Sequence, residues 1–358
     1  MTVRLDRKRL AAIIGLLLIS LAGTNGNNEG GGTGALAVSA PVSRSFRGSI
    51  GNSHVEMNLV IAGDQLSGTY SYDRIRQAIK LTGQLNKSGG LELKEFDASG
   101  KQTGKFVCKG PLGDPLESDC SWSKPNGSGE SPVFLTEQHV SFTNSLQITP
   151  KVLSNRQKGL DVSYPQMSGG TGPAVIAAEN FNRRIGNLVN RAIKEFEPID
   201  PAGHNRFETN YTVLLGTNDL VSVEMYEYSD AGAAHPNDRY WALTWDLAAN
   251  REVQLEDLFK PGADFKPPIA EYLVAEINKR VERIDREDAK REGREFKPRE
   301  DPLISVEQLA EPAAFALTPQ GLMIYFDFPH VIAVFNKNFV PNSVVAQHLR
   351  RVPPYQNR

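Results

Sequence analysis

The sequence predicts an α+β protein made of two domains. An all-β module, either a small barrel or a sandwich, is expected over residues 43–138, and an α+β domain with an antiparallel sheet packed on helices over residues 142–350. Three observations predict this organisation: a series of short strands in the first half, a change of composition near His139, and two long helical patterns separated by hairpins in the second half. At 358 residues and 40% hydrophobic content, the chain is long enough for two buried cores.

The first module is predicted from the spacing of its strands. Between Phe46 and Glu137, short apolar stretches are bounded by Gly, Asn, Asp or Ser. Such strands recur at intervals of roughly 8 to 12 residues, which is typical of a sandwich or small barrel.

The second domain is predicted to begin with a strand over 142–149 and a helix over 173–196. Strands over 207–215 and 220–228 are separated by a Gly-Thr-Asn-Asp turn, and a third strand follows over 240–247. Because consecutive strands are joined by short turns, we expect antiparallel hairpins and not βαβ units.

A long helix is predicted to begin near Pro267 and Pro268, since proline is tolerated in the first turn. Its apolar stripe consists of Ile269, Leu273, Val274, Ile277, Val281 and Ile284. Residues 286–300 are mostly charged, with mixed signs, so we expect the helix to continue into solvent there. Two further strands and a short terminal helix complete the domain.

The N-terminus predicts export. Four basic residues within 1–9 precede an apolar run over 10–22, which suits a signal peptide; residues 1–40 are therefore expected to be a signal peptide and flexible leader. The alternative is an uncleaved N-terminal segment, which would be the chain's contact with the membrane. Either interpretation places the folded part outside the cytoplasm, in the periplasm or secreted.

The two cysteines are predicted to form a disulfide. Cys108 and Cys120 flank a turn-rich segment that can fold the chain back on itself. Free thiols or half of a metal site are the alternatives, but further Cys or His ligands at suitable spacing are not nearby.

The sequence contains no recognised catalytic motif and no recognised cofactor-binding motif. The six histidines include no pair at helical zinc-binding spacing, and the sequence lacks a nucleophile elbow, a P-loop and a dinucleotide-binding motif. We therefore expect no cofactor, no metal site and no recognised catalytic residue. The net charge of -2 gives no general reason to bind nucleic acid.

The best candidate for a ligand site is the loop over 229–237. Gly232 can adopt a positive φ and Pro236 favours an extended backbone at His235, so the imidazole is expected at a defined place between paired strands. Tyr228 and Tyr240 are expected to supply aromatic surface beside it. The predicted ligand-binding residues are thus Tyr228, Gly232, His235 and Tyr240.

Two alternatives for these residues stay open. His235 could hold the loop through hydrogen bonds to backbone, or act in acid–base catalysis with a nearby carboxylate. Trp241 and Trp245 share a strand face with Leu243, a pattern more typical of a core than of a sugar-binding platform.

The loop and its flanks carry a family signature. The segment Tyr228–Asn237, followed by Trp245-Asp246-Leu247, resembles a motif Y-S-x-x-G-G-A-H-x-N then F-D-L, and the stretch from Leu317 to Phe326 resembles the family's later strand. The resemblance covers roughly 146–349 and is to an uncharacterised domain shared by the lysozyme-sensing anti-sigma factor RsiV and the N-terminal part of the peptidoglycan deacetylase PdaC. Ala233 replaces the family's second glycine.

The resemblance implies a role at the cell envelope. Its known members point to peptidoglycan, another glycan, or a lysozyme-like protein as the ligand, and not to deacetylase activity, which PdaC carries in a separate domain. We therefore expect a secreted or periplasmic non-catalytic binding protein. The alternative function is an envelope hydrolase with an unrecognised site near His235.

Overall fold

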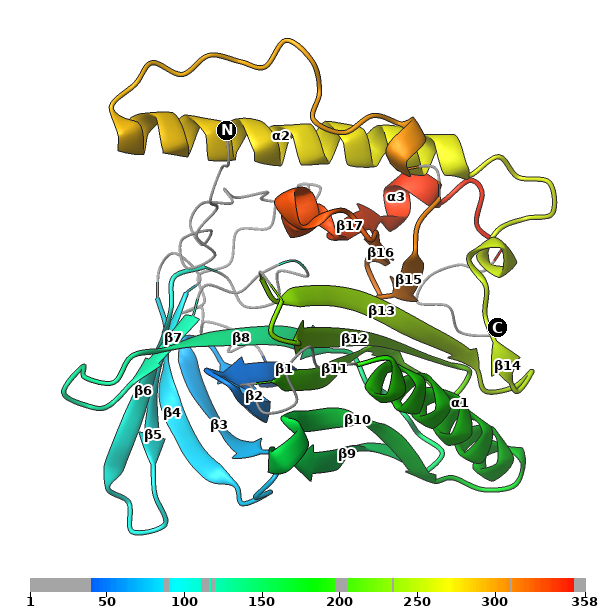
Figure 1. Cartoon of the computed structure of the whole chain (residues 1–358). Helices are drawn as coiled ribbons and strands as arrows, with labels where there is room; N and C mark the ends of the chain where they lie inside the picture. The colour runs from blue at the N-terminus through cyan, green and yellow to red at the C-terminus, as the bar shows by residue number, and fades with distance from the viewer. Residues whose placement is uncertain are drawn as a thin grey trace, which may run out of the picture. The chain divides into compact units, whose positions relative to one another are not determined.

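The computed structural model describes residues 40–86, 90–110, 116, 120–196, 205–233, 235–309 and 311–350. The predicted signal peptide and leader lie outside the described residues apart from Ala40. The chain forms two compact units that divide between Glu137 and Gln138. The predicted α+β class is confirmed, because a closed antiparallel barrel is followed by sheets packed on helices (Figure 1). None of the helices in the described residues is long and apolar enough to cross a membrane.

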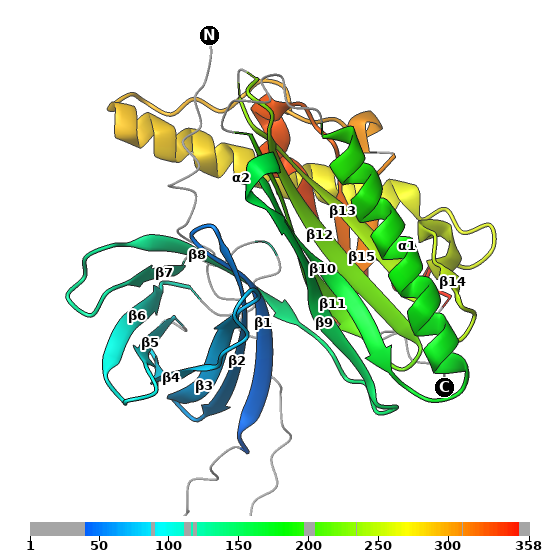
Figure 2. The ribbon, with the colours of Figure 1, turned by 60° about the horizontal axis from the view of Figure 1, so that its bottom comes forward.

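The first unit is a barrel of eight consecutive antiparallel strands, which Figure 2 shows curving round into a ring. The glycine at 48 permits closure, since a Cβ there would collide with the carbonyl of Phe134 on the last strand. The strands are β1 (Val42–Ile50), β2 (Ser53–Ala62), β3 (Gln65–Tyr72), β4 (Ile79–Leu85), β5 (Leu91–Phe96), β6 (Gln102–Cys108), β7 (Cys120–Ser123) and β8 (Ser131–Gln138).

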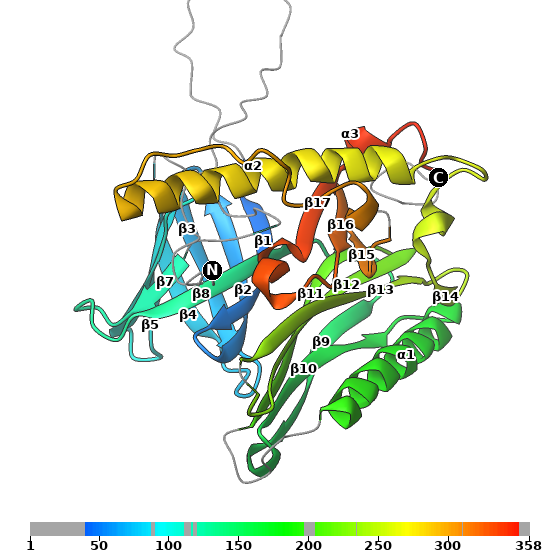
Figure 3. The same cartoon turned by 45° about the horizontal axis from the view of Figure 1, so that its top comes forward.

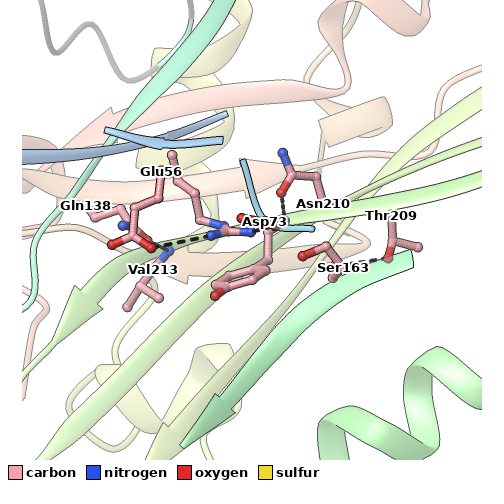
Figure 4. Close-up of polar contacts among 9 residues, drawn as sticks. Glu56, Asp73, Gln138, Ser163, Thr209, Asn210 and Val213 are labelled. Carbon is pink, nitrogen blue, oxygen red and sulfur yellow. Dashed lines mark hydrogen bonds and ion pairs between the residues drawn. The ribbon is translucent and has the colours of Figure 1, made fainter. Parts of the chain in front are cut away.

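Alternate residues of these strands fill the barrel, as expected for a small barrel with a side-chain core. The largest of the buried side chains are Phe46, Met57, Leu59, Tyr70, Leu81, Leu91 and Phe106. The side chain of Arg47 on β1 is fully buried and forms ion pairs with Asp73 and with Glu56, its partner on β2. Figure 4 labels the two carboxylate residues.

Glu95 places a carboxylate inside the barrel, and both of its oxygens accept hydrogen bonds. Glu95 is buried, and its Oε2 accepts hydrogen bonds from the Tyr70 hydroxyl at 2.8 Å and from Trp122 Nε1 at 2.7 Å. The Thr103 hydroxyl donates to Oε1 at 2.6 Å. A buried charge is tolerated when its hydrogen bonds are satisfied in this way.

The predicted disulfide is confirmed. Cys108 and Cys120 lie directly opposite each other on β6 and β7, with Cα atoms 4.0 Å apart, and are bonded. A disulfide indicates an oxidising compartment outside the cytoplasm.

The second unit is built on a six-stranded sheet in the order β14-β13-β12-β11-β10-β9. Its strands are β9 (Leu146–Asn155), β10 (Leu160–Gly169), β11 (Arg206–Gly216), β12 (Leu220–Asp230), β13 (Asn237–Asp246) and β14 (Arg251–Glu252). The predicted hairpin of β11 and β12 is confirmed by their antiparallel register. β10 and β11 are the one parallel pair in this sheet, and the Thr209 hydroxyl donates to the Ser163 carbonyl across it at 3.1 Å (Figure 4).

One strand was not predicted. The sequence indicates a single strand before the first helix, whereas β9 and β10 both precede it. β10 lacks a clear alternation because Val162, Ser163 and Tyr164 are all buried in succession. Pro165 also argues against a central strand, but it faces Pro150 of β9 and is accommodated there.

The helix α1 (Pro173–Glu195) matches its predicted bounds and lies along one face of the sheet (Figure 2). It buries Phe181, Ile185 and Val189 against residues of β10 to β13. Leu243 and Trp245 belong to this core and Trp241 packs against it. The core interpretation of these aromatic residues is therefore confirmed.

The opposite side of the sheet faces a small sheet of three strands, which α2 (Lys266–Glu292) covers in turn (Figure 3). The small sheet consists of β15 (Ala314–Leu317), β16 (Gly321–Tyr325) and β17 (Lys337–Pro341), followed by the short helix α3 (Asn342–Val345). Ile269, Leu273, Ile277 and Val281 of α2 are buried here, as their spacing predicts.

The end of α2 differs from the prediction. The helix stops at Glu292 and does not continue to Glu300, because Gly293 adopts φ 68° and its N–H donates to the carbonyls of Ala289 and Lys290. The chain then turns back along the helix, and Arg299 Nε forms an ion pair with Asp285 Oδ2 of α2 at 2.6 Å. A glycine in this conformation is the usual helix stop.

Candidate functional site

A cavity of about 390 Å³ lies in the second unit, at the end of the β12–β13 hairpin. Three segments line it: the end of α1 with Glu195 and Phe196, the hairpin over 227–239, and the segment over 327–333 that follows β16. A volume of this size falls within the range of small-molecule sites.

The free edge of β13 explains why the cavity forms here. β13 pairs with β14 only through Trp245 and Asp246, so its earlier residues form an edge among the described strands. Glu227 has the same strand parity as Val223 and Met225, which pack on the α1 side. The segment after β16 also lines the cavity, so residues of α1, of the hairpin and of this segment meet near the free edge of β13.

A charged pair forms one wall. Glu227 and Arg239 are directly opposite each other on β12 and β13. The guanidinium contacts both carboxylate oxygens, Nε to Oε1 at 2.8 Å and Nη2 to Oε2 at 3.1 Å. Glu227 is buried while about half of the Arg239 side chain is exposed, so Arg239 can offer its remaining N–H groups to a ligand.

The lining is acidic. Glu195, Glu227, Asp238 and Asp327 line the cavity, with Arg239 as the single guanidinium. Glu195 and Asp327 are exposed and make no hydrogen bond or ion pair with any described residue. Their oxygens are available as acceptors for hydroxyl or amino groups, and the charge disfavours an anionic ligand.

Two imidazoles stack at the rim. The rings of His235 and His330 have centroids 4.0 Å apart and planes 12° apart. His235 lies on the hairpin loop, where its Nδ1 is 3.4 Å from the Pro236 carbonyl oxygen. His330 begins the 3₁₀ helix η5 (His330–Phe335) and lines the cavity together with Phe328.

The loop has the backbone that its sequence predicts at Gly232, whose φ is 80°. The N–H of Gly232 donates to Asp230 Oδ1 at 3.1 Å, which closes a local turn. Gly232 and His235 therefore lie in the loop that forms the rim.

The two predicted tyrosines lie elsewhere. Tyr240 stacks with Tyr325 at 5.8 Å between ring centroids and contacts Tyr226 at 5.3 Å, on the sheet face opposite to α1. Tyr228 lies under the guanidinium of Arg206, 5.2 Å from its ring centroid. None of the four predicted residues, Tyr228, Gly232, His235 and Tyr240, is among the described residues that line the cavity. Gly232 follows the lining residue Ala231, and His235 stacks on the lining residue His330.

A second group of buried polar contacts, between Glu224, Tyr325 and Lys337, lies beside the ring of Tyr240. Glu224 is buried and accepts a hydrogen bond from the Tyr325 hydroxyl at 2.6 Å and one from Lys337 Nζ at 2.9 Å. Lys337 Nζ is also 5.3 Å from the centroid of the Tyr240 ring. Burial, reinforced by the charge of Glu224, raises the pKa of Tyr325 well above its ordinary value, so this hydroxyl remains a donor.

Sequence reasoning missed His330, Asp327 and Phe328 as members of the site. They belong to a segment far from the loop in sequence, and no local pattern pairs the two. Within the described part of the chain, no group of three or more His, Cys, Asp or Glu side chains is placed to hold a metal ion.

Comparison with known proteins identifies part of this unit. Residues 256–333 match the family model described as a protein of unknown function, DUF3298. They include α2, β15, β16 and the segment with Asp327 and His330, so the chain carries a DUF3298 domain there.

Two solved structures are similar to the chain. A DUF3298 family member from Bacteroides fragilis is 14% identical, with a TM-score of 0.39, over 58% of this chain and 94% of the other. A DUF3298 family protein from Pseudomonas aeruginosa is 13% identical, with a TM-score of 0.35, over 57% of this chain and 94% of the other. No protein with a curated description matches the chain.

Proposed function

We propose that this chain, which carries a DUF3298 domain over residues 256–333, is a secreted or periplasmic binding protein of the cell envelope without catalytic activity. Its ligand is a glycan, most simply peptidoglycan, bound in the cavity beside His330. The observation that carries the proposal is the cavity itself, which joins the loop of His235 to the segment of Asp327 and His330.

The chemistry of the lining suits a sugar. Sugar hydroxyls need acceptors and donors in a small space, and Asp327, Asn237 and Arg239 supply both types. Phe328 and His330 add flat ring surface against which a pyranose can pack. Because the lining is acidic, it favours neutral or amino sugars over phosphorylated ones.

Two further observations support an envelope location. The disulfide between Cys108 and Cys120 fits an oxidising compartment. The motif from Tyr228 to Asn237 resembles that of the domain shared by RsiV and PdaC, whose members act at the envelope.

The acidic lining also favours a second candidate ligand, a basic protein of the lysozyme type. A lysine or arginine side chain could enter the cavity and pair with Asp327 or Glu195, which have no described protein partner. A hydrolase remains the alternative from another class. The structure gives it little support, because neither His235 nor His330 hydrogen-bonds to a carboxylate among the described residues.

The test is a binding assay with purified protein against insoluble peptidoglycan and against lysozyme, repeated at rising salt. We expect saturable binding to peptidoglycan that survives about 0.5 M NaCl, where charge-only attraction is screened. Asp327→Asn should weaken it about tenfold, the effect of losing one charge-assisted hydrogen bond. Asp301→Asn, which changes an exposed carboxylate outside the cavity, should leave binding unchanged.

The other outcomes separate the candidates. Binding to lysozyme alone that depends on Asp327 would replace the glycan with a basic protein. Release of soluble sugar that stops in His235→Ala, with folding retained, would establish the hydrolase. Binding to neither ligand, or equal effects of the Asp327 and Asp301 variants, would overturn the proposal.

A further inference from the structure

The edge of β13 between the hairpin loop and β14 is open to a further strand. The Thr244 carbonyl accepts a hydrogen bond from the Val253 N–H at 2.9 Å, so Thr244 presents its backbone polar groups to the side of β13 away from β12. Alternate residues of an antiparallel strand present their N–H and C=O groups to the same side. Ala242 therefore faces outward as well, and its outward backbone groups have no hydrogen-bond partner among the described residues.

A buried donor lies next to this edge. The Nε1 atom of Trp241 is buried and has no hydrogen-bond partner in the described part of the chain. Trp241 precedes Ala242, and its side chain lies on the α1 side of the sheet with Leu243. A buried N–H without an acceptor is costly, and a strand added beside β13 would bring acceptor groups to this side of the edge.

The charge at the start of the edge favours a basic ligand. β13 begins at the acidic cavity, whose lining includes Asp238 of β13 itself, Glu195 and Asp327. A positively charged side chain of a ligand on this edge can enter the cavity and pair with these carboxylates.

The extent of the edge favours a short segment. β14 already pairs with the outer side of β13 from Trp245 onward, and the strand itself begins at Asn237. The open stretch is thus residues 237–244. A second copy of the chain, paired here through a two-fold axis, would run antiparallel and direct its hairpin loop at β14. A flexible peptide in extended conformation meets no such obstacle.

We propose that the edge of β13 binds an extended, basic segment of a partner protein as an added strand. Backbone hydrogen bonds to Ala242 hold the segment, and a lysine or arginine at its end pairs with the cavity carboxylates. In this mode of recognition the main chain supplies affinity and a few side chains supply specificity. The inference goes beyond the glycan proposed for the cavity and does not depend on it.

A synthetic peptide tests the edge directly. The probe alternates valine and threonine over about six residues, carries a lysine at each end, and is acetylated and amidated. At ten times its dissociation constant, the amide hydrogen of Ala242 should exchange about tenfold more slowly, as measured by NMR. A peptide with glutamate in place of both lysines should bind about tenfold more weakly. A version methylated at every backbone nitrogen, which removes its donors, should not bind.

Two variants at Ala242 separate the backbone donor from the side chain. Ala242→Pro removes the outward N–H and spares the pairing with β12, because proline is tolerated where the N–H of a strand faces away from its neighbour. It should weaken binding of the lysine peptide about fivefold, the effect of one neutral hydrogen bond. Ala242→Gly keeps the donor and should bind like the wild type. Ala242 is not among the described residues that line the cavity, so peptidoglycan binding should be unchanged in both variants.

Three results would overturn the inference. One is unchanged exchange at Ala242 when the lysine peptide is added. Another is equal peptide binding by the proline and glycine variants, both shown to be folded by circular dichroism; if the proline variant does not fold, equal binding of the methylated peptide to the wild type has the same meaning. The third is exchange at Ala242 that slows with protein concentration alone, which would assign the edge to a second copy of the chain. None of these readouts uses peptidoglycan, so a failed peptidoglycan assay remains distinguishable.

Discussion

The hydroxyl of Tyr325 donates to Glu224 at 2.6 Å and links the three-stranded sheet to the six-stranded sheet. Lys337 reaches the other oxygen of the same carboxylate from β17 at 2.9 Å. Tyr325 is fully buried, and Glu224 and Lys337 are nearly so. One carboxylate on β12 therefore holds donors from both β16 and β17, and it positions Lys337 over the ring of Tyr240.

Removing the Tyr325 hydroxyl should destabilise the second unit less than removing the Lys337 ammonium group. We expect Tyr325→Phe to cost about 1.5–3 kcal/mol, the range for a hydrogen bond to a charged group. Lys337→Met should cost about 3–5 kcal/mol, because it leaves a buried carboxylate without its counter-charge. Urea unfolding measures both. Tyr272→Phe removes a half-buried hydroxyl that has no hydrogen-bond partner among the described residues, so it should stay within about 0.5 kcal/mol of the wild type. An equal loss in Tyr272→Phe and Tyr325→Phe would contradict the assignment.

The raised pKa of Tyr325 predicts an alkaline loss of stability. Burial favours the protonated hydroxyl in the folded state, so its contribution is complete below the ordinary tyrosine pKa of about 10. As the pH rises above that value, the unfolded chain releases the proton first and unfolding becomes easier. Urea unfolding at a series of pH values between 8 and 11 should show this fall, and the fall should be shallower in Tyr325→Phe. Identical slopes would show that the hydroxyl does not titrate in this way.

The fold was largely predictable because its signals are local. Alternating apolar residues between Gly and Asn turns predict the barrel strands, and the apolar stripe from Ile269 predicts α2. The predicted end of α2 was wrong although a local signal was present, since Lys290 and Arg291 precede Gly293, the usual arrangement at a helix C-terminus. β10 was not predictable, because its burial on both faces removes the alternation on which such predictions depend.

The sequence indicated the neighbourhood of the candidate site but not its lining. A loop signature identifies Gly232 and His235, which adjoin the lining residues Ala231 and His330, but nothing local indicates that His330 stacks on His235. Strand parity, which is local, already separates Tyr228 from Glu227 on opposite faces of β12. Parity alone does not say which of these residues lines the cavity, since Asp238 lies opposite Tyr228 and is part of the lining; both the lining and the partner segment require the tertiary fold.

Ser222 should be a sensitive position in the packing between the sheets. Its hydroxyl oxygen accepts a hydrogen bond from the Leu317 N–H at 2.7 Å and lies 2.7 Å from the Thr244 hydroxyl, all in buried surroundings. Ser222→Ala leaves a buried backbone N–H without its acceptor, so we expect a loss of about 1–3 kcal/mol in urea unfolding. The exposed Ser168→Ala is the control and should be neutral. A neutral Ser222→Ala would mean that another acceptor replaces the hydroxyl.

Two substitutions of Glu95 that remove different numbers of acceptors test how much its hydrogen bonds stabilise the barrel. In Glu95→Gln, the amide oxygen can still accept from Tyr70 and Trp122 while the hydroxyl of Thr103 can turn to accept, so we expect a loss of about 1 kcal/mol. Glu95→Leu removes every acceptor and leaves the Trp122 N–H and the Tyr70 hydroxyl unsatisfied. It should cost at least about 2–3 kcal/mol more. Hydrogen exchange of the barrel strands measures both variants, and equal losses would argue against a hydrogen-bonding role for the carboxylate.

The disulfide should stabilise the first unit and leave the second unaffected. Cys108 and Cys120 are separated by 12 positions in the chain, and for a loop of that size the chain-entropy model predicts about 3 kcal/mol. Hydrogen exchange read by mass spectrometry follows peptides from both units in one experiment. In Cys108→Ser with Cys120→Ser, we expect faster exchange in β1 to β8 and unchanged exchange in α1 and β9 to β13. Because the bond joins neighbouring strands of the barrel alone, a similar loss in both units would show that they unfold together and do not behave as independent units.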